Sequence, residues 1–407
     1  MRICDVNNFY TPTGGGVRVY HERKLEYFAD HPEHAYALLA PAEREGIRRV
    51  GAATIYDVPA AAIGGSGYRM ILSRRALARV FDDFAPDLVE IGSPYVLPLL
   101  VPAALGRRPA ATVGFVHADY PDTYVAPAMS RWPGLGGLAA GLARRHMGAI
   151  YRRMDATLAA SEYVLRKLRR LGVERLFHAP LGVEASRFCP AARSPEVRAR
   201  LGAGPDRALL LFMGRLAPEK GIDLLIDTYP AIRDPARLTL VIAGHGPAEE
   251  RVAALCARYP EIVRAGPMAR DEVAAAMASA DLFLALGAHE TFSLCTLEAL
   301  ACGTPVVAPA AGGAAELIDR FGGGRTFAPG SADALAAAIA DALAAPRPDG
   351  DALHRRIAEG HDWPAVFHRL VGVYEAIHAA RRARDPARLR APDGWWPPGE
   401  APLTGPV

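Results

Sequence analysis

The sequence predicts an α/β protein made of two doubly wound, parallel-sheet domains that face each other across a cleft. A length of 407 residues is ample for two domains, and a hydrophobic content of 51% allows two large cores. Short apolar segments alternate with helical segments along most of the chain, as in parallel sheets covered by helices on both faces. A looser stretch at 189–207, rich in proline, alanine and charge, separates two such series.

The first series predicts a domain over residues 1–188. Because parallel strands are joined by right-handed crossovers, a strand–helix order of this kind gives a doubly wound domain. Helices are expected at 17–29, 69–84 and 162–171, and strands at 2–6, 35–40, 54–58, 87–91, 111–116, 156–160 and 176–179.

The second series predicts a domain over residues 189–362, followed by a helix at 363–385 and a tail at 386–407. The tail holds six prolines and three glycines, so we expect it to be mostly irregular. Two such domains joined by a hinge place a ligand cleft between them. Strands of the second domain are expected at 209–213, 238–243, 262–265, 282–286 and 305–308.

Charge and cysteine content exclude several classes of protein. A net charge of +3 is too small to indicate a nucleic-acid partner. The five cysteines are scattered and form no CxxC pair, which is typical of reduced thiols rather than of disulfides or a zinc site. Residue 1 leads directly into a strand-like run, so we expect no signal peptide and a cytoplasmic location, with the inner face of the membrane as an alternative.

Residues 131–175 form a basic segment with ten lysines and arginines against three acidic residues. Its first part also carries apolar side chains, and such a segment can lie on an anionic membrane surface. A solvated helix face is the more common outcome for a charged segment, so peripheral membrane contact stays an alternative. The apolar residues are Trp132, Leu135, Leu138, Leu142 and Met147.

Three glycines, Gly14 to Gly16, follow the first predicted strand and open the first predicted helix. Glycine lets a ligand approach the backbone closely, and a helix N-terminus favours an anion. The segment is not a dinucleotide-binding fingerprint, because Val19 stands at the third glycine position. We therefore expect an anion site here, with a flexible turn as the alternative.

Arg215 and Lys220 share the loop GRLAPEKG at 214–221. A guanidinium can bind two oxygens of a diphosphate, and an ammonium acts as a point charge. The alternative is a surface loop with a Glu219–Lys220 charge pair. Only three of the 47 basic residues are lysines, which favours a specific role for this one. Small residues in the later loop AGHGP, at 243–247, would let a base or sugar pack against the backbone.

Glu290 and Glu298 lie eight positions apart in HETFSLCTLEALACGTPVV, at 289–307. The first carboxylate could accept hydrogen bonds from sugar hydroxyls, and the second, one turn into a helix, from ribose hydroxyls. Between them, backbone N–H groups at Phe292, Ser293 and Leu294 could bind phosphate at the helix start.

These motifs, with Gly312-Gly313-x-x-Glu316, resemble the nucleotide-binding half of retaining glycosyltransferases with the GT-B fold, of the group 1 or family 4 type. GGGVRVY, His117, Ala160-Ser161-Glu162 and PLGVEASRF are similar to the N-terminal half of that family. The resemblance covers roughly residues 1–380. It implies two Rossmann-like domains, an acceptor-binding one at 1–188 and a nucleotide-sugar-binding one at 189–362, and a final helix that crosses back to the first.

The resemblance implies a role for each motif. Arg215 and Lys220 would bind the donor diphosphate, Glu290 the transferred sugar and Glu298 the ribose, while His117 would lie near the donor sugar. The implied catalytic residues are Glu290, His117, Arg215 and Lys220. The implied donor-binding residues are Gly15, Gly16, Arg215, Lys220, Gly246, Phe292, Ser293, Leu294 and Glu298. Two residues depart from the family, His245 where aspartate is usual and Ser293 where glycine is usual.

The resemblance also implies a retaining, metal-independent transferase without a cofactor. It would move a hexose of the mannose or glucose type from a UDP- or GDP-sugar to a carbohydrate or lipid-linked acceptor, in polysaccharide or glycolipid synthesis. A same-fold epimerase and a non-catalytic nucleotide-sugar-binding protein remain alternatives. A dinucleotide-dependent oxidoreductase is a further one, opposed by the missing fingerprint.

Overall fold

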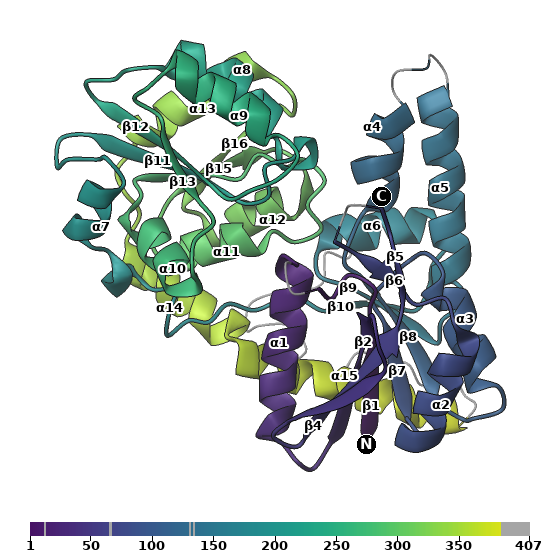
Figure 1. Ribbon diagram of the computed structural model, residues 1–407. Coiled ribbons are helices and arrows are strands. Elements are labelled where there is room, and N and C mark those ends of the chain that lie inside the picture. Colours follow the sequence, from purple (N-terminus) through teal and green to yellow (C-terminus); the bar gives the residue numbers. More distant parts are fainter. Residues whose placement is uncertain (12–13, 65–66, 130–131, 133–134, 384–407) are drawn as a thin grey trace.

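A computed structural model describes residues 1–11, 14–64, 67–129, 132 and 135–383. Two α/β domains follow one another, each with a central sheet between helices (Figure 1). This confirms the predicted fold class. The tail predicted at 386–407 lies outside the described residues.

The first sheet has the strand order β10-β9-β8-β7-β1-β2-β4-β3 and is parallel except for the β3–β4 pair. Strand β3 and the β5–β6 hairpin were not predicted, because β3 has two arginines among its five residues and β5 and β6 have only two residues each; four of the five β3 residues are exposed. The strands are β1 (Arg2–Val6), β2 (Ala35–Ala42), β3 (Gly46–Val50), β4 (Ala53–Pro59), β5 (Ala61–Ala62), β6 (Arg69–Met70), β7 (Leu88–Ile91), β8 (Ala111–Val116), β9 (Ala156–Ala159) and β10 (Leu176–His178).

One helix of this domain differs from its prediction. The segment expected to be helical at 69–84 begins with β6, and its helix starts only at Arg74. The Ser73 side chain accepts a hydrogen bond from the Ala76 N–H at 3.1 Å and so caps the helix start. The helices are α1 (Gly16–Ala29), α2 (Arg74–Phe84), α3 (Leu97–Leu105), the π-helix η1 (Pro121–Val125), α4 (Ala126–Met129), α5 (Leu135–Tyr151) and α6 (Glu162–Arg170).

The second sheet is fully parallel, with the order β13-β12-β11-β14-β15-β16. Strand β11 lies in the middle, so the loops after β11, β12 and β14 emerge from one edge. The strands are β11 (Ala208–Met213), β12 (Leu238–Ala243), β13 (Val263–Gly266), β14 (Leu282–Leu284), β15 (Val306–Pro309) and β16 (Gly324–Phe327).

Helices cover both faces of the second sheet, and two C-terminal helices lead back to the first domain (Figure 1). The helical elements are 3₁₀ η2 (Pro190–Ala192), α7 (Pro195–Arg200), 3₁₀ η3 (Pro218–Lys220), α8 (Ile222–Ile232), α9 (Glu249–Arg258), α10 (Arg270–Ser279), α11 (Leu294–Ala301), α12 (Gly312–Phe321), α13 (Ala332–Ala344), α14 (Gly350–His361) and α15 (Trp363–Ala383).

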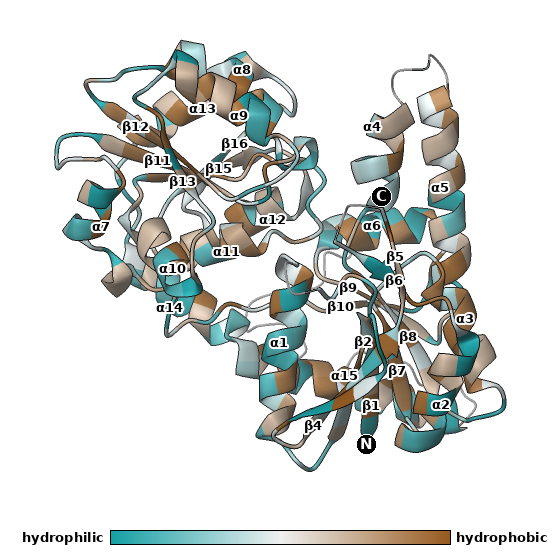
Figure 2. Ribbon diagram, viewed as in Figure 1, coloured by the Kyte–Doolittle hydropathy of each residue, from teal (hydrophilic) through white to brown (hydrophobic). Residues whose placement is uncertain are grey.

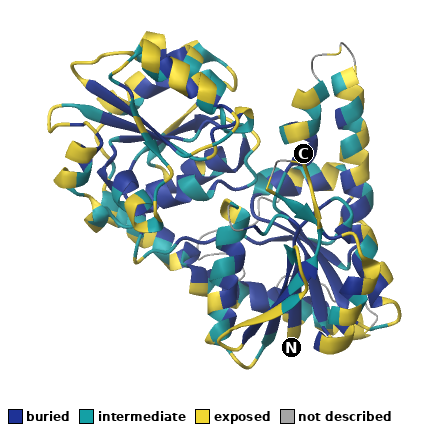
Figure 3. Cartoon of the chain, in the orientation of Figure 1, coloured by how far each residue is buried: buried dark blue, intermediate teal, exposed yellow. Residues whose placement is uncertain are grey.

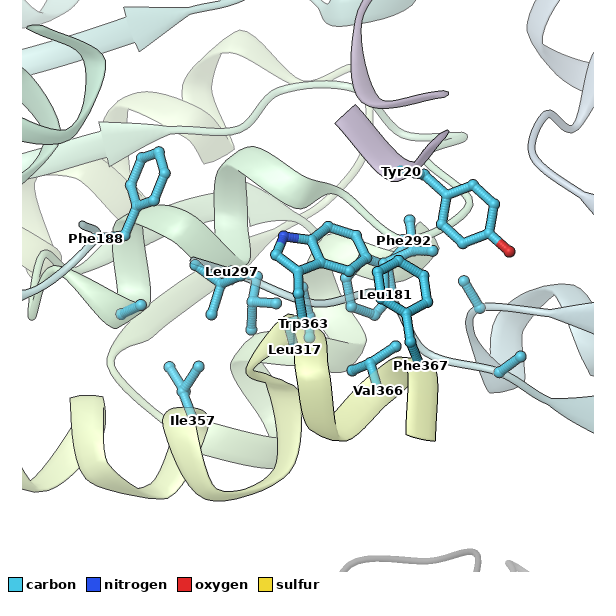
Figure 4. Close-up of a cluster of buried hydrophobic side chains, with 14 of the residues drawn as sticks. Tyr20, Leu181, Phe188, Phe292, Leu297, Leu317, Ile357, Trp363, Val366 and Phe367 are labelled. Carbon is cyan, nitrogen blue, oxygen red and sulfur yellow. The ribbon is translucent and has the colours of Figure 1, made fainter. Parts of the chain in front are cut away.

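Buried residues concentrate in the two sheets, and exposed residues lie on outer helices and loops (Figure 3). The central strands are correspondingly hydrophobic (Figure 2). One hydrophobic cluster continues from the first domain into the second. In Figure 4, Trp363 and Phe367 lie among Tyr20 of the first domain and Phe292 and Leu297 of the second. The domains therefore share a core at their junction.

A buried polar network fixes α15 to the first domain. The Lys24 ammonium of α1 lies 2.7 Å from Asp5 Oδ2 and 3.3 Å from Glu90 Oε2, and both carboxylates are fully buried. The Tyr374 hydroxyl of α15 accepts from Lys24 at 2.7 Å and donates to Glu90. The partners come from α1, β1, β7 and α15. The network therefore joins Lys24 to Tyr374, which are 350 positions apart in the sequence.

Candidate functional site

The loop after β11, which carries Arg215 and Lys220, packs tightly against the loop after β12. A Cβ on Gly244, which has φ 121°, would lie 1.9 Å from the Gly214 carbonyl oxygen, so only glycine allows the loops after β11 and β12 to pack this closely. A Cβ on Gly246 would lie 2.5 Å from the Leu216 oxygen, and its N–H donates to Glu249 at 3.3 Å. These contacts hold the loop that carries Arg215.

Lys220 and Glu290 form an ion pair across the loops that follow β11 and β14. The Lys220 ammonium lies 2.5 Å from Glu290 Oε1, and the two side chains are 38% and 21% exposed. Although burial opposes it, the Glu290 carboxylate raises the pKa of Lys220, which keeps the ammonium charged. Glu219 pairs instead with Arg215, at 3.5 Å, so the alternative Glu219–Lys220 pair is wrong. The site thus holds two partly exposed cations, each paired with a carboxylate.

Ser293 is the N-cap residue of α11, and its backbone has a conformation that glycine adopts freely. Its φ of 72° and ψ of 76° lie in the left-handed region, disfavoured by roughly 1–2 kcal/mol for other residues. The Ser293 hydroxyl lies 2.8 Å from Thr296 Oγ1 on the next turn. Next to this turn, a Cβ on Gly313 would lie 2.4 Å from Phe292 Cα, so α12 begins directly against the loop. Phe292 itself is buried.

The loops of the two domains meet at this point. A Cβ on Gly16 would lie 3.0 Å from Leu294 Cδ1, so the start of α1 faces the start of α11. Among the described residues, none lies within 4 Å of a Cβ built on Gly15. The Thr291 hydroxyl donates to the His117 carbonyl oxygen at 3.0 Å, from the second domain to the first. The predicted site residues Gly16 and His117 of the first domain therefore lie against the Thr291–Leu294 loop of the second domain.

His117 follows β8 with its ring stacked on Phe115, at 4.3 Å between centroids and 8° between planes. Its Nε2 is buried and makes no hydrogen bond to any residue that the structure describes. Burial, and then the nearby His21 and Lys24, lower the pKa of His117 well below 6.5. The imidazole is therefore neutral near pH 7 and has a nitrogen available to a ligand.

Glu298 is 5% exposed and is bound by an arginine that the sequence analysis missed. Arg270 Nη2 lies 3.2 Å from Glu298 Oε1, and the same guanidinium lies 3.7 Å from Glu184, in the segment that follows β10. Burial raises the pKa of Glu298 to about 7, and Arg270 opposes the rise. Because Arg270 starts α10, 28 positions before Glu298, no local pattern links the two.

Glu316 bridges the two domains. Its carboxylate accepts the backbone N–H groups of Glu162 and Tyr163 at 2.9 and 3.0 Å, at the first turn of α6. A carboxylate at a helix N-terminus is favourable because the free N–H groups and the helix dipole point toward it. Sequence alone identified Glu316 as part of a motif but did not reveal this partner.

Two further findings concern metal-ion sites and helices that could span a membrane. Within the described ranges, His, Cys, Asp and Glu side chains nowhere gather in threes as a metal-ion site would require. None of the helices in the part of the chain that the structure describes is both long and apolar enough to cross a membrane.

Residues 207–345 match the family model described as Glycosyl transferases group 1, and residues 14–187 match Glycosyltransferase Family 4. A GDP-mannose-dependent alpha-(1-6)-phosphatidylinositol dimannoside mannosyltransferase of Mycobacterium tuberculosis is 30% identical, covering 95% of this chain and 99% of its own. A GDP-mannose-dependent alpha-mannosyltransferase of the same species is 32% identical, over 94% of this chain and 98% of its own.

Solved structures share the fold at lower identity. Sucrose-phosphate synthase from Thermosynechococcus elongatus superposes with a TM-score of 0.77 at 19% identity, covering 93% of this chain and 100% of its own. Anabaena Alr3699/HepE in complex with UDP and glucose gives a TM-score of 0.69 at 18% identity, over 92% of this chain and all of its own.

Proposed function

The chain belongs to the glycosyl transferases group 1 family and has the GT-B fold, and on that premise we propose that it transfers mannose from GDP-mannose to a hydroxyl group of a carbohydrate or lipid-linked acceptor. It is a nucleotide-sugar-dependent hexosyltransferase. The GDP-mannose-dependent relatives support the choice of donor. They favour neither an epimerase, nor a non-catalytic binding protein, nor an oxidoreductase.

The observation that carries the proposal is the Lys220–Glu290 ion pair on the second domain, with the start of α1 facing Leu294 across the domain boundary. In transfer, the bond between the sugar C1 and the diphosphate oxygen breaks, and negative charge develops on the diphosphate. Lys220 and Arg215 are the cations that would neutralise this charge, with backbone N–H groups of Gly15 and Gly16 as donors from the first domain. When the donor binds, the Lys220 ammonium would leave Glu290 and contact a phosphate oxygen instead.

Glu290 would then accept hydrogen bonds from hydroxyls of the transferred mannose. His117 would bind the same sugar from the other domain through Nε2, its neutral form causing no charge repulsion with the developing oxocarbenium ion. Glu298 would accept from the ribose, with Arg270 holding its carboxylate. Phe292, Ser293, Leu294 and Gly246 would line the donor through backbone groups.

We propose retention of the anomeric configuration and no metal requirement. The acceptor hydroxyl attacks C1 from the face that the diphosphate leaves, and the hydroxyl proton passes to the leaving diphosphate. Lys220 and Arg215 supply the positive charge for which other transferases use a cation. Proton NMR of the product anomeric signal tests retention, and an unchanged rate in EDTA tests metal independence.

Thermal unfolding with nucleotides tests the donor class. GDP should raise the Tm more than UDP or ADP at equal concentration, since only a bound ligand stabilises the native state. GDP-mannose should be turned over with release of GDP. Stabilisation by UDP without any effect of GDP would refute GDP-mannose as the donor.

We further propose that α5 rests on an anionic membrane surface. Leu135, Leu138 and Leu142 recur at helical spacing on α5 and are 47%, 61% and 60% exposed. Arg145 on the same helix is also exposed. α4 and α5 stand together and extend beyond the first sheet (Figure 1). An exposed apolar row with cations beside it is the pattern of an interfacial helix.

Vesicle sedimentation tests this surface. The protein should bind phosphatidylglycerol vesicles more than phosphatidylcholine vesicles, and Leu138→Glu should reduce binding severalfold. Leu343→Glu is the matched control, because Leu343 is an exposed leucine on α13 of the other domain. Equal binding of both variants would contradict the membrane contact.

A further inference from the structure

Glu184 lies in the segment that follows β10, and arginines of three different elements surround its carboxylate. Its Oε2 atom lies 3.3 Å from Arg187 of the same segment, 3.5 Å from Arg23 of α1 and 3.7 Å from Arg270 of α10. The α1 helix belongs to the first domain and the α10 helix to the second. Glu184 therefore contacts cations of both domains, although the proposed function gives it no role.

Arg270 is shared between Glu184 and the carboxylate of Glu298. Its Nη2 atom lies 3.2 Å from Glu298 Oε1, while its Nε atom faces Glu184. The same guanidinium lies 5.0 Å from the ring centroid of Phe188, which is fully buried, and a cation is attracted to the face of an aromatic ring. Glu184 and Phe188 both belong to the segment PLGVEASRF. This short segment therefore holds the guanidinium that contacts Glu298.

The contacts of Arg270 leave one oxygen of Glu298 to a ligand. Within the described residues, the hydrogen bond to the Glu298 carboxylate comes from Arg270 Nη2 and reaches Oε1. A guanidinium that is free to turn binds both oxygens of a carboxylate through two parallel N–H bonds. The negative charge of Glu184 opposes that turn, because full pairing with Glu298 would move the Nε side of the guanidinium away from Glu184. Oε2 of Glu298 is thereby left to accept from a hydroxyl.

Arg270 and Glu184 also act on the charge of Glu298. Burial raises the pKa of Glu298 to about 7, Arg270 opposes that rise and Glu184 adds to it. Cys295 on the same helix and Cys302 at its C-cap are titratable groups close to Glu298. Burial raises the pKa of both thiols above 9, so both are uncharged near neutral pH. The two charged partners from other elements therefore control the pH at which Glu298 ionises.

We propose that Arg270 and Glu184 are positioning residues that make the nucleotide site selective for ribose. Arg270 orients the Glu298 carboxylate through Oε1, and Glu184 holds Arg270 away from Oε2, which then accepts from a ribose hydroxyl. Both residues act through Glu298. Because Arg23 of α1 also contacts Glu184, the first domain takes part in this selection. The inference rests on the proposed function, which assigns Glu298 to the ribose, and adds the residues that prepare Glu298 for that contact.

The test compares Glu184→Gln and Arg270→Gln with Asp271→Asn. Asp271→Asn is the matched control, because Glu184 and Asp271 both contact Arg187, at 3.3 and 3.0 Å, and Glu184 also lies against Arg270. Isothermal titration calorimetry measures the Kd of GDP and of 2′,3′-dideoxy-GDP, which lacks both ribose hydroxyls, between pH 5.5 and 8.5. The ratio of the two Kd values is the ribose preference, and it cancels effects on the base and the diphosphate that both nucleotides share.

At pH 8.5 the wild type and Asp271→Asn should prefer GDP at least about tenfold, the typical value of one hydrogen bond to a charged group. Glu184→Gln should lower the preference below about threefold, because Arg270 then occupies both Glu298 oxygens.

Arg270→Gln should move the rise of the ribose preference with pH to higher pH, because no cation then opposes the raised pKa of Glu298. A purely structural role of Arg270 would leave the pH of that rise unchanged. Equal preferences of Glu184→Gln and Asp271→Asn, a wild-type pH curve for Arg270→Gln, or no wild-type preference for GDP would overturn the inference. A wild type that binds no nucleoside diphosphate would instead refute the proposed function.

Discussion

Glu90 offers a direct test of how the buried network at α15 sets stability. Its carboxylate is fully buried, 3.3 Å from Lys24 and hydrogen-bonded by Tyr20 and Tyr374. Burial first, and then the charge of Asp5, raise the pKa of Glu90 to about 7 from 4.5. The folded state therefore binds the Glu90 proton more tightly than the unfolded chain does, and stability falls as pH rises from about 4.5 to about 7.

The size of this effect follows from the shift. About 2.5 pKa units correspond to roughly 3 kcal/mol lost on going from pH 4.5 to above pH 7. Glu90→Gln cannot ionise and keeps an oxygen for the tyrosine hydroxyls. We expect its Tm to match the wild type near pH 5 and to exceed it by roughly 3–4 °C near pH 8. Differential scanning fluorimetry across pH 5–8.5 measures both curves.

Asp5→Asn in the same network supplies the control, with the opposite sign. Although burial opposes it, Lys24 and His21 lower the pKa of Asp5. Asp5 therefore contributes stability above its unfolded pKa, and this stability is lost as pH falls through the folded pKa. Asp5→Asn should lower the Tm at pH 7. Parallel wild-type and Glu90→Gln curves between pH 5 and 8 would refute the reasoning.

Three further predictions concern the site. Lys220→Met should lower kcat for mannosyl transfer by about 10²–10³-fold, because the variant lacks one of the preorganised positive charges that stabilise the leaving diphosphate. A rate within threefold of wild type would exclude that role. Gly313→Ala should weaken GDP binding in calorimetry at least about tenfold, because its Cβ would lie 2.4 Å from the Phe292 backbone. Gly372→Ala, with no neighbour within 4 Å, should leave GDP affinity unchanged. Glu316→Ala should lower the Tm by about 1–2 °C, since two N–H groups lose their acceptor at about 1 kcal/mol for a helix cap; an unchanged Tm would mean that the contact contributes nothing.

Local motifs carried much of the candidate site. Arg215, Lys220, Gly16 and Glu290 all lie in short strand-to-helix loops, where residue type and spacing are visible along the chain. Arg270 had no such signal. Its partner is distant in sequence, because Arg270 meets Glu298 from another helix, 28 positions away.

The sequence by itself determined two parallel-sheet domains, because apolar strands that alternate with helices have few other ways to bury their surface. It also determined which loops carry cations and carboxylates. The tertiary structure alone decided that Lys220 meets Glu290 from 70 positions away, that Glu316 caps α6 of the other domain, and that Tyr374 enters the core of the first domain. Strand order and domain contact fix these pairs, and neither is encoded in the spacing of neighbouring residues.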